Sequence, residues 1–322
     1  MKKLIAFTVV FLMLFSLAAC GGNGDNGGNG GNEPQKAKTV ADDRSIFEMR
    51  ITAPEGFTSM QRYTNKKGDG TLIEKDLVFT LADGSEYSFG CMCGQILSEL
   101  TDVSGLATKE VNGVSYYVIE RSSASYAFAQ RENDLYAVQY TPAEEQEDAA
   151  ESENTEETQA AAENQGLDYA LSAITYTDSE EPELDDTELY DLSIPQEGLN
   201  TNGYTVTVTA TPDGEITEKS VSWKFGEDSE RPDFSISTRI FRGKTVEDKL
   251  KEDKEYEKKT VGELEDTVLV DTSEDAPYDY FIQHGEDVYE IRNHGDTGGL
   301  FVKRTEESFE ALEKILNSVT FK

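Results

Sequence analysis

Two cysteines close together in the chain, Cys91 and Cys93, have the residue type and spacing for thiol chemistry. They lie in an alternating stretch typical of a strand, where residues i and i+2 point to the same face. Three interpretations are open: inert, partly buried thiols, a strained and reducible disulfide, or a metal or redox role. Structural zinc needs four ligands, and both histidines, His284 and His294, lie far along the chain. We therefore expect no metal site and no cofactor.

The other reactive residue types form no recognised catalytic pattern. The sequence has no Gly-x-Ser-x-Gly elbow for a serine nucleophile. With 64 Asp and Glu residues, a carboxylate pair for glycoside hydrolysis cannot be chosen from the sequence. Adjacent acids at 185–186, 227–228 and 274–275 could bind calcium, but none has the spacing of an EF-hand loop. The sequence predicts no catalytic residue and leaves a carboxylate- or metal-dependent hydrolase as an alternative.

The third cysteine, Cys20, follows a basic start, Lys2-Lys3, and an apolar run over 4–17. A run of about 14 residues is shorter than the ~20 that span a bilayer and is typical of a secretory signal. Its ending, Leu17-Ala18-Ala19-Cys20, resembles a bacterial lipobox, in which the cysteine is acylated and the chain is cut before it. We expect residues 1–19 to be a lipoprotein signal peptide. Cys20 then carries palmitate or similar chains and anchors the protein at the cell surface, outside the cytoplasm.

The formal net charge of −35 restricts the partners of this chain. Nucleic-acid-binding proteins depend on clusters of Lys and Arg, so nucleic acid is excluded as a partner. Residues 20–44 begin with a Gly- and Asn-rich stretch that cannot bury apolar surface and predicts a flexible tether. The expected partners are the membrane, through the N-terminal lipid, and another envelope protein or wall component.

An internal repeat with a period near 150 residues organises the rest of the chain. Phe128-x-Gln130 followed by Asp134-Leu135-Tyr136 corresponds to Phe281-x-Gln283 followed by Asp287-Val288-Tyr289. The ends also agree, Ile174-Thr175-Tyr176 with Val319-Thr320-Phe321. We therefore predict two tandem domains, 45–178 and 188–322, joined by an acidic linker over 179–187. The first carries an acidic insert near 142–166, which should be solvated coil.

Each copy shows mostly the period of two that predicts half-buried strands of an antiparallel sheet. Ala82-Asp83-Gly84 and Pro212-Asp213-Gly214 predict hairpin turns. Thr245 and Asp248 resemble a capping box that would open a helix over 246–258, with a counterpart at 96–100. A second helix is predicted over 307–317, where the apolar residues share one face. The fold class expected from these elements is α+β.

The opening Pro54-Glu55-Gly56-Phe57, the antiparallel sheet and the final helix running into Ser318-Val319-Thr320-Phe321 resemble PsbP-like domains. Such domains occur in bacterial lipoproteins. The resemblance implies two copies of an α/β/α sandwich around an antiparallel sheet. It implies no shared catalytic residues, because members of the family mostly bind or support other proteins.

Tyrosines near the repeated motifs could form a recognition surface. Tyrosine on an exposed sheet face binds partners well, whereas the same residues can equally be core or sheet-flanking. The candidates are Tyr116, Tyr136, Tyr280 and Tyr289. With the anchor and the repeat, they suggest a non-enzymatic binding or scaffold module. A hydrolase and a solute-binding accessory protein are the alternatives.

Overall fold

The computed structural model describes residues 44–121, 123–143, 166–177, 192–193, 201–226, 233–250, 255–260, 267–271, 278–295 and 304–321. The predicted signal peptide, Cys20, nearly all of the predicted acidic insert and the predicted linker lie outside these residues. None of the helices in the described ranges is long and apolar enough to span a bilayer.

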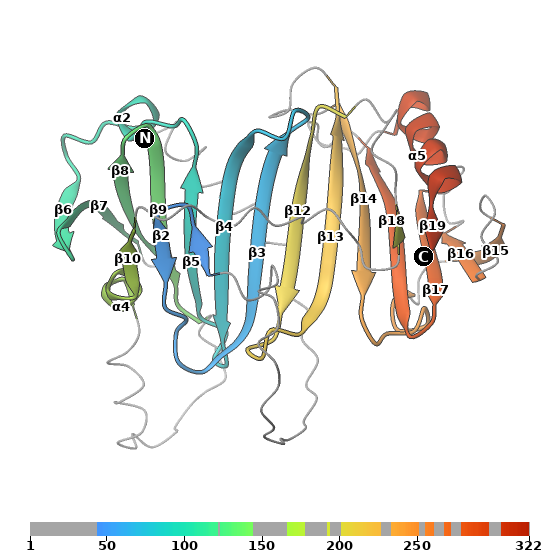
Figure 1. The fold of residues 1–322 in the computed structure, drawn as a ribbon, viewed down its shortest axis with the longest axis horizontal. Helices are drawn as coiled ribbons and strands as arrows, with labels where there is room; N and C mark the ends of the chain where they lie inside the picture. The colour runs from blue at the N-terminus through green and yellow to red at the C-terminus, as the bar shows by residue number, and fades with distance from the viewer. Residues whose placement is uncertain are drawn as a thin grey trace.

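A single antiparallel sheet of 14 strands runs through both halves of the chain (Figure 1). Its strand order is β15-β16-β17-β18-β14-β13-β12-β3-β4-β5-β9-β8-β7-β6. Read outward from the centre, β3, β4, β5, β9, β8, β7 and β6 of the first half match β12, β13, β14, β18, β17, β16 and β15 of the second. The two halves therefore have the same topology and meet at β3 and β12.

The strands of the sheet alternate with short turns in each half. The first half contributes β3 (Phe57–Lys67), β4 (Leu72–Leu81), β5 (Glu86–Met92), β6 (Ala107–Val111), β7 (Val114–Glu120), β8 (Ser125–Arg131) and β9 (Asp134–Thr141). The second contributes β12 (Gly203–Ala210), β13 (Ile216–Phe225), β14 (Phe234–Phe241), β15 (Tyr256–Lys259), β16 (Thr267–Asp271), β17 (Asp279–His284) and β18 (Asp287–Gly295).

The first hairpin of each half shows how closely the halves correspond. In the first half the Lys67 amide donates to the Thr71 carbonyl, and Gly70 has a φ of 86°. In the second half the Thr211 amide donates to the Glu215 carbonyl, and Gly214 has a φ of 82°. Each left-handed glycine closes the turn at little steric cost. Residues of β3 and β4 therefore correspond to residues 144 positions later in the chain.

The junction between the halves is close to two-fold symmetric. β3 and β12 pair antiparallel, with Tyr63 opposite Thr207, and these two residues occupy equivalent positions in their halves. An antiparallel pair has a local two-fold axis, and this axis passes between Tyr63 and Thr207. The backbone of one half therefore continues into the other without a sheet edge between them.

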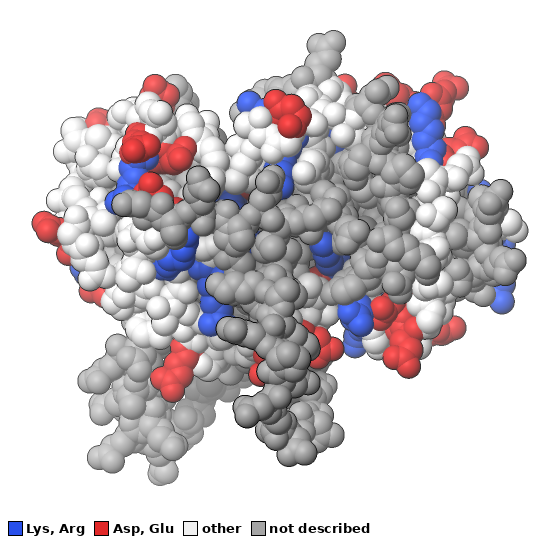
Figure 2. Space-filling model, viewed as in Figure 1, with Lys and Arg blue, Asp and Glu red and all other residues white. Residues whose placement is uncertain are grey.

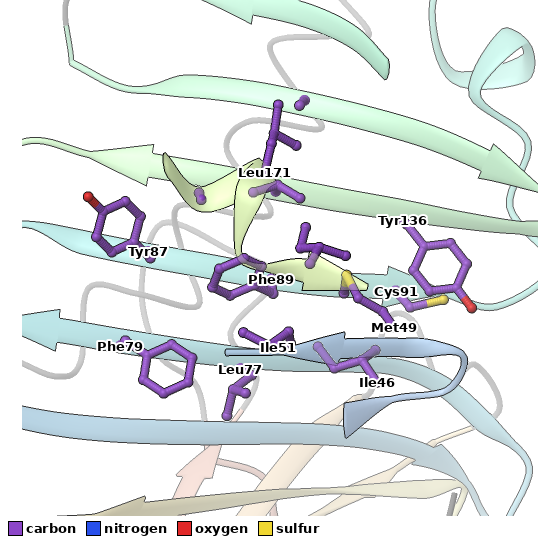
Figure 3. Close-up of a cluster of buried hydrophobic side chains, with 14 of the residues drawn as sticks. Ile46, Met49, Ile51, Leu77, Phe79, Tyr87, Phe89, Cys91, Tyr136 and Leu171 are labelled. Carbon is purple, nitrogen blue, oxygen red and sulfur yellow. The ribbon is translucent and has the colours of Figure 1, made fainter. Parts of the chain in front are cut away.

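One face of the sheet, here called the core face, carries the apolar residues of the central strands, such as Phe79 and Trp223. In the first half it is covered by α4 (Leu167–Ser172) and by the small sheet of β1 (Ser45–Ile46), β2 (Met49–Ile51) and β10 (Ile174–Tyr176). Figure 3 shows Ile46, Met49 and Ile51 of that layer next to Leu77 and Phe79. In the second half α5 (Glu306–Ser318) covers the same face, and β11 (Leu192–Ser193) pairs with β19 (Thr320–Phe321).

The predicted fold class, an α+β protein with α/β/α sandwiches, is wrong. The described chain is mostly β, and its three helices are α2 (Leu97–Leu100), α4 and α5, of which two have six residues or fewer. Such helices are too short to form a helical layer on each face of a sheet.

The helix predicted over 246–258 is also wrong. Residues Val246 to Leu250 form a turn, and Tyr256–Lys259 is strand β15, which pairs with β16. Pairing at the sheet edge satisfies the backbone of this segment and overrides its helical pattern. The helix predicted over 307–317 is confirmed as α5, which begins after Thr305, whose side chain accepts the Ser308 amide.

Candidate functional site

The face of the sheet opposite the core face, here called the polar face, carries buried polar residues of the central strands such as Asp76, Ser88 and Glu290. Side chains alternate between the faces along each strand, so Leu77 and Phe79 point to the core face and Asp76 and Val78 to the polar face. The polar face ends in an apolar cluster in each half, around Leu97 in the first and around Val246 in the second.

The motif that revealed the repeat builds the same structure at both ends of the polar face. Gln130 Oε1 accepts the Leu97 amide (3.0 Å), and its Nε2 donates to the carbonyls of Gln95 and Asp134 (3.2 and 3.0 Å). Gln283 Oε1 accepts the Val246 amide (2.9 Å), and its Nε2 donates to the equivalent carbonyls of Lys244 and Asp287 (3.4 and 3.1 Å). The repeated glutamine therefore fixes two turns to each other.

The aspartate of the motif has an equivalent structural role. Asp134 Oδ1 accepts the Gly94 amide, and Asp287 Oδ1 accepts the Gly243 amide, both at 2.9 Å. These bonds align Gly94 with Gly243, so residues of β5 correspond to residues 149 positions later. The glutamine and the aspartate that the two halves share in this motif therefore have structural roles.

The polar face of the second half holds a chain of alternating charges. Arg239 lies between Glu218 (3.2 Å) and Glu290 (3.9 Å). Arg292 contacts Glu290 (2.8 Å) and donates from Nε to Asp279 Oδ2 (3.1 Å). Each buried carboxylate of this network has a guanidinium beside it, which is the condition for keeping a charge away from water.

The polar face of the first half differs at the corresponding positions. Gly90 and Ala137 stand where the second half has Arg239 and Glu290, because Gly90 pairs with Asp76 and Ala137 as Arg239 pairs with Ser220 and Glu290. A Cβ on Gly90 would lie 2.0 Å from Asp76 Oδ1, so the Asp76 carboxylate lies directly over this glycine. A glycine here thus makes room for the acid of the neighbouring strand.

Three buried side chains around Gly90 have unpaired polar atoms. Asp76 and Ser88 are each 3 % exposed, and Gln139 is 5 % exposed. Within the part of the chain that the structure describes, Asp76 Oδ1, Ser88 Oγ and Gln139 Oε1 have no hydrogen-bond partner. Ser88 pairs with Gln139 and lies two residues from Gly90 on the same face. We call Asp76, Ser88 and Gln139 the acceptor cluster.

The rim of this cluster is more exposed and contains a second carboxylate. Tyr63 and Glu74 are half-buried. Burial raises the pKa of Glu74, against the opposing effects of Lys224 and of a hydrogen bond from Asn65. Lys224 Nζ in turn donates to Asn65 Oδ1 at 2.9 Å. Lys224 comes from the second half, so its ammonium joins the two halves on this face.

The electrostatics of Asp76 are those of an uncompensated buried acid. Burial, and then the charge of Glu74, raise the pKa of the Asp76 carboxyl well above its ordinary value. The same two carboxyls, after burial, raise the pKa of Tyr63. The cluster can therefore bind a cation, or a neutral donor when Asp76 is protonated.

One serine–histidine contact in the second half has the geometry of a nucleophile and its base. Ser237 Oγ lies 2.7 Å from His294 Nε2. Burial, and then Arg292, Arg239 and Arg304, lower the pKa of His294 to about 4. A general base works best with a pKa near the operating pH, and the surrounding guanidinium groups oppose formation of an imidazolium. This contact therefore fits a structural hydrogen bond better than a catalytic dyad.

The structure brings the two predicted thiols together. Cys91 is fully buried and Cys93 is half-buried, and neither forms a disulfide in the described structure. A hydrogen bond with Cys93, and then burial, raise the pKa of the Cys91 thiol. Since the thiolate is the reactive form, Cys91 is an inert core residue.

We predict that iodoacetamide labels Cys93 of the folded protein without prior reduction and labels Cys91 only after unfolding. Peptide mapping by mass spectrometry measures both. Labelling of neither cysteine until a reductant is added would instead show a disulfide.

All four candidate tyrosines lie in the core. Tyr116, Tyr136, Tyr280 and Tyr289 are between 0 and 5 % exposed. Tyr116 and Tyr136 pack under the small sheet of the first half, and Tyr280 and Tyr289 belong to the cluster beneath α5. Their hydrophobic rings stabilise the fold, and they offer no surface to a partner.

The remaining sequence-based sites are not formed by described residues. Cys20 and the acid pairs at 185–186, 227–228 and 274–275 lie outside the described ranges. Within those ranges, no group of three or more His, Cys, Asp or Glu residues is arranged to hold a metal ion. In the view of Figure 2, Lys and Arg side chains are interspersed with Asp and Glu side chains over the described residues.

The sequence analysis missed the acceptor cluster. The available signal was a position-by-position comparison of the two repeats. Gly90 in the first copy corresponds to Arg239 in the second, and this pair of residues marks the difference. The pairing of Asp76 with Gly90 could not be seen without the register of the sheet.

Comparisons with known proteins leave the function open. No protein-family model and no curated protein matches the chain. Among solved structures, it is similar to the immunity protein TplEi of T6SS from Pseudomonas aeruginosa complexed with "L" peptide, at 10 % identity, covering 87 % of this chain and 99 % of that one, with a TM-score of 0.23. It is also similar to MucB in complex with MucA(peri), at 10 % identity, covering 82 % and 93 %, with a TM-score of 0.17. Both neighbours were solved with a partner, but TM-scores this low carry no argument about this chain.

Proposed function

We propose that the protein is a lipid-anchored, extracytoplasmic binding module without catalytic activity. The basic start, the short apolar run and the ending at Cys20 support the anchor. Two or three acyl chains on one cysteine would give lasting attachment, since a single chain holds a protein only marginally. The tether after Cys20 would let the sheet reach partners in the envelope.

The observation that carries the binding role is the difference between the two polar faces. The second half pairs each acid of its network with an arginine. In the first half, among the described residues, the acceptors Asp76 Oδ1, Ser88 Oγ and Gln139 Oε1 have no hydrogen-bond partner, and no arginine stands beside Asp76. The unpaired atoms of the second-half network, Arg239 Nε and Asp279 Oδ1, belong instead to groups in ion pairs. Buried polar groups are normally satisfied, so an exception of this kind needs an explanation. Recognition of a partner by the acceptor cluster is that explanation, and another envelope protein or a wall component is the expected partner.

The anchor is tested by replacing Cys20 with serine. We predict that the wild-type protein incorporates labelled palmitate and sediments with membranes, whereas Cys20→Ser does neither. A Cys93→Ser variant, which removes a thiol but keeps the lipobox, should behave as wild type. If the wild-type protein does not incorporate labelled palmitate, the proposed lipid anchor is wrong.

The binding role is tested by cross-linking on intact cells followed by purification of the protein. Recovery of one defined envelope component supports the proposal. Absence of any cross-linked component, together with turnover of a wall polymer by the purified protein, would favour a hydrolase.

A further inference from the structure

The acceptor cluster of the first half has an internal template in the second half. At the position of Gly90 the second half has Arg239, and at the position of Gln139 it has Arg292. Glu74 of the first half corresponds to Glu218, which contacts Arg239 at 3.2 Å. The second half therefore shows that this part of the polar face can accommodate a guanidinium group.

The described residues of the first half supply no guanidinium at this place. On the polar face of β4, β5 and β9 the charged residues are Glu74, Asp76 and Glu86, all of them acids. The nearby base is Lys224 of β13, whose ammonium is engaged with Asn65 and lowers the pKa of Glu74. Among the residues that the structure describes, Asp76 thus differs from Glu74 in having no cation beside it.

The atoms left unpaired are all able to accept hydrogen bonds. A carboxylate and an amide oxygen are acceptors, and a serine hydroxyl can accept as well as donate. A guanidinium has five N–H donors in a planar fork and suits several such acceptors at once. Tyr63 and Glu74 are half-buried and lie beside Asp76 on the same face, Tyr63 opposite it and Glu74 two residues before it.

We propose that the acceptor cluster binds the guanidinium group of an arginine side chain on a partner polypeptide. The inference rests on the proposed binding role and names the chemistry of the partner. Asp76 supplies the charge, while Ser88 and Gln139 orient the planar group. The strong negative charge of the chain steers a basic segment toward the site.

The test is calorimetric titration of the full-length protein in detergent with a capped Gly-Arg-Gly peptide at physiological salt. We expect saturable binding that weakens at least tenfold in Asp76→Asn, which keeps the shape of the side chain. The double variant Asp76→Ser, Gly90→Arg recreates the Ser220–Arg239 pair of the second half and should also lose binding while remaining folded. Glu99→Gln removes an exposed acid elsewhere and should bind as wild type.

Other probes identify the ligand class. A capped Gly-Lys-Gly peptide should bind more weakly than its arginine counterpart, because an ammonium cannot make the planar contacts. Agmatine tests a free guanidinium, and binding as tight as that of the peptide would assign the site to a small molecule instead of a polypeptide. Equal binding of the arginine peptide by wild type and Asp76→Asn, or saturable calcium binding that excludes the peptide, would overturn the inference.

The outcome is separable from that of the binding role as a whole. If cross-linking recovers the same envelope component from cells carrying Asp76→Asn, the protein binds a partner through another surface. The proposal that the acceptor cluster binds a guanidinium group is then wrong, and the proposed binding role of the protein stands. If no partner is recovered from wild-type cells while the arginine peptide still binds, the site stands without its proposed biological role.

Discussion

Replacing Asp76 with asparagine is expected to stabilise the protein at neutral pH by roughly 1 kcal/mol or more, because burial and Glu74 disfavour the charged carboxylate and the neutral amide does not carry that cost. The Asp76 carboxyl is 3 % exposed, lies over Gly90 and has no hydrogen-bond partner at Oδ1 among the described residues. Asparagine has nearly the same shape and no charge. Urea unfolding followed by circular dichroism measures the difference.

The pH dependence of this effect has a definite sign. Burial and Glu74 raise the folded-state pKa of Asp76 above the ordinary value of about 3.9. The folded state therefore holds its proton more tightly than the unfolded chain, and the wild type loses stability as pH rises from about 4 through the folded-state pKa. The advantage of Asp76→Asn should be largest at neutral pH and vanish below pH 4. Lower stability of the variant at neutral pH would show that Asp76 has a counter-ion.

A matched control separates this effect from the general repulsion within an acidic chain. Glu99→Gln also removes one negative charge, but Glu99 is exposed on α2. It should change the unfolding free energy by no more than about 0.5 kcal/mol, as surface substitutions usually do. If both variants stabilise equally, the gain comes from net charge and not from burial.

Replacing Gln283 with alanine is expected to destabilise the protein by about 2–4 kcal/mol. The side chain accepts the Val246 amide and donates to the carbonyls of Lys244, Gly285 and Asp287. Each such bond contributes about 0.5–1.5 kcal/mol, and the half-buried position limits replacement by water. Differential scanning calorimetry of the purified variant measures the loss.

Two further variants show which hydrogen bonds account for the loss of stability in Gln283→Ala. Gln283→Glu keeps the acceptor for Val246 but cannot donate to three carbonyls, so it should lose most of the same free energy. Gln130→Ala breaks the equivalent network in the first half, where the side chain is exposed. The loss of unfolding free energy in Gln130→Ala should be smaller than in Gln283→Ala, because water can replace the missing donor. Equal stability of Gln283→Ala and wild type would show that the repeated glutamine is not structural.

The sequence predicted local elements of this protein better than its assembly. The strands, the hairpin turns at Gly84 and Gly214 and the helix α5 follow from period, turn residues and an N-cap. The expected α+β class with α/β/α sandwiches failed because strands make up most of the described residues and two of the three described helices have six residues or fewer. The helix expected after Thr245 failed because strand pairing at the sheet edge overrode its pattern.

The candidate site was beyond the reach of sequence reasoning for a physical reason. Asp76 and Gly90 lie in different strands, and Gln139 comes from a third, β9, which joins β5 only after four intervening elements. Periodicity indicates which residues share a face of one strand but not which strands are neighbours. The tyrosines were identifiable as important, yet periodicity alone did not separate the core face from the polar face.

The pairing of β3 with β12 has a consequence for how such a chain can change. A protein with one repeat would leave β3 as a bare edge and would have to assemble as a homodimer with two identical halves. A fused tandem gene frees each half to mutate alone while the other preserves the scaffold. Glycine at 90 and arginine at 239 are an asymmetry that no symmetric dimer encoded by a single copy could hold.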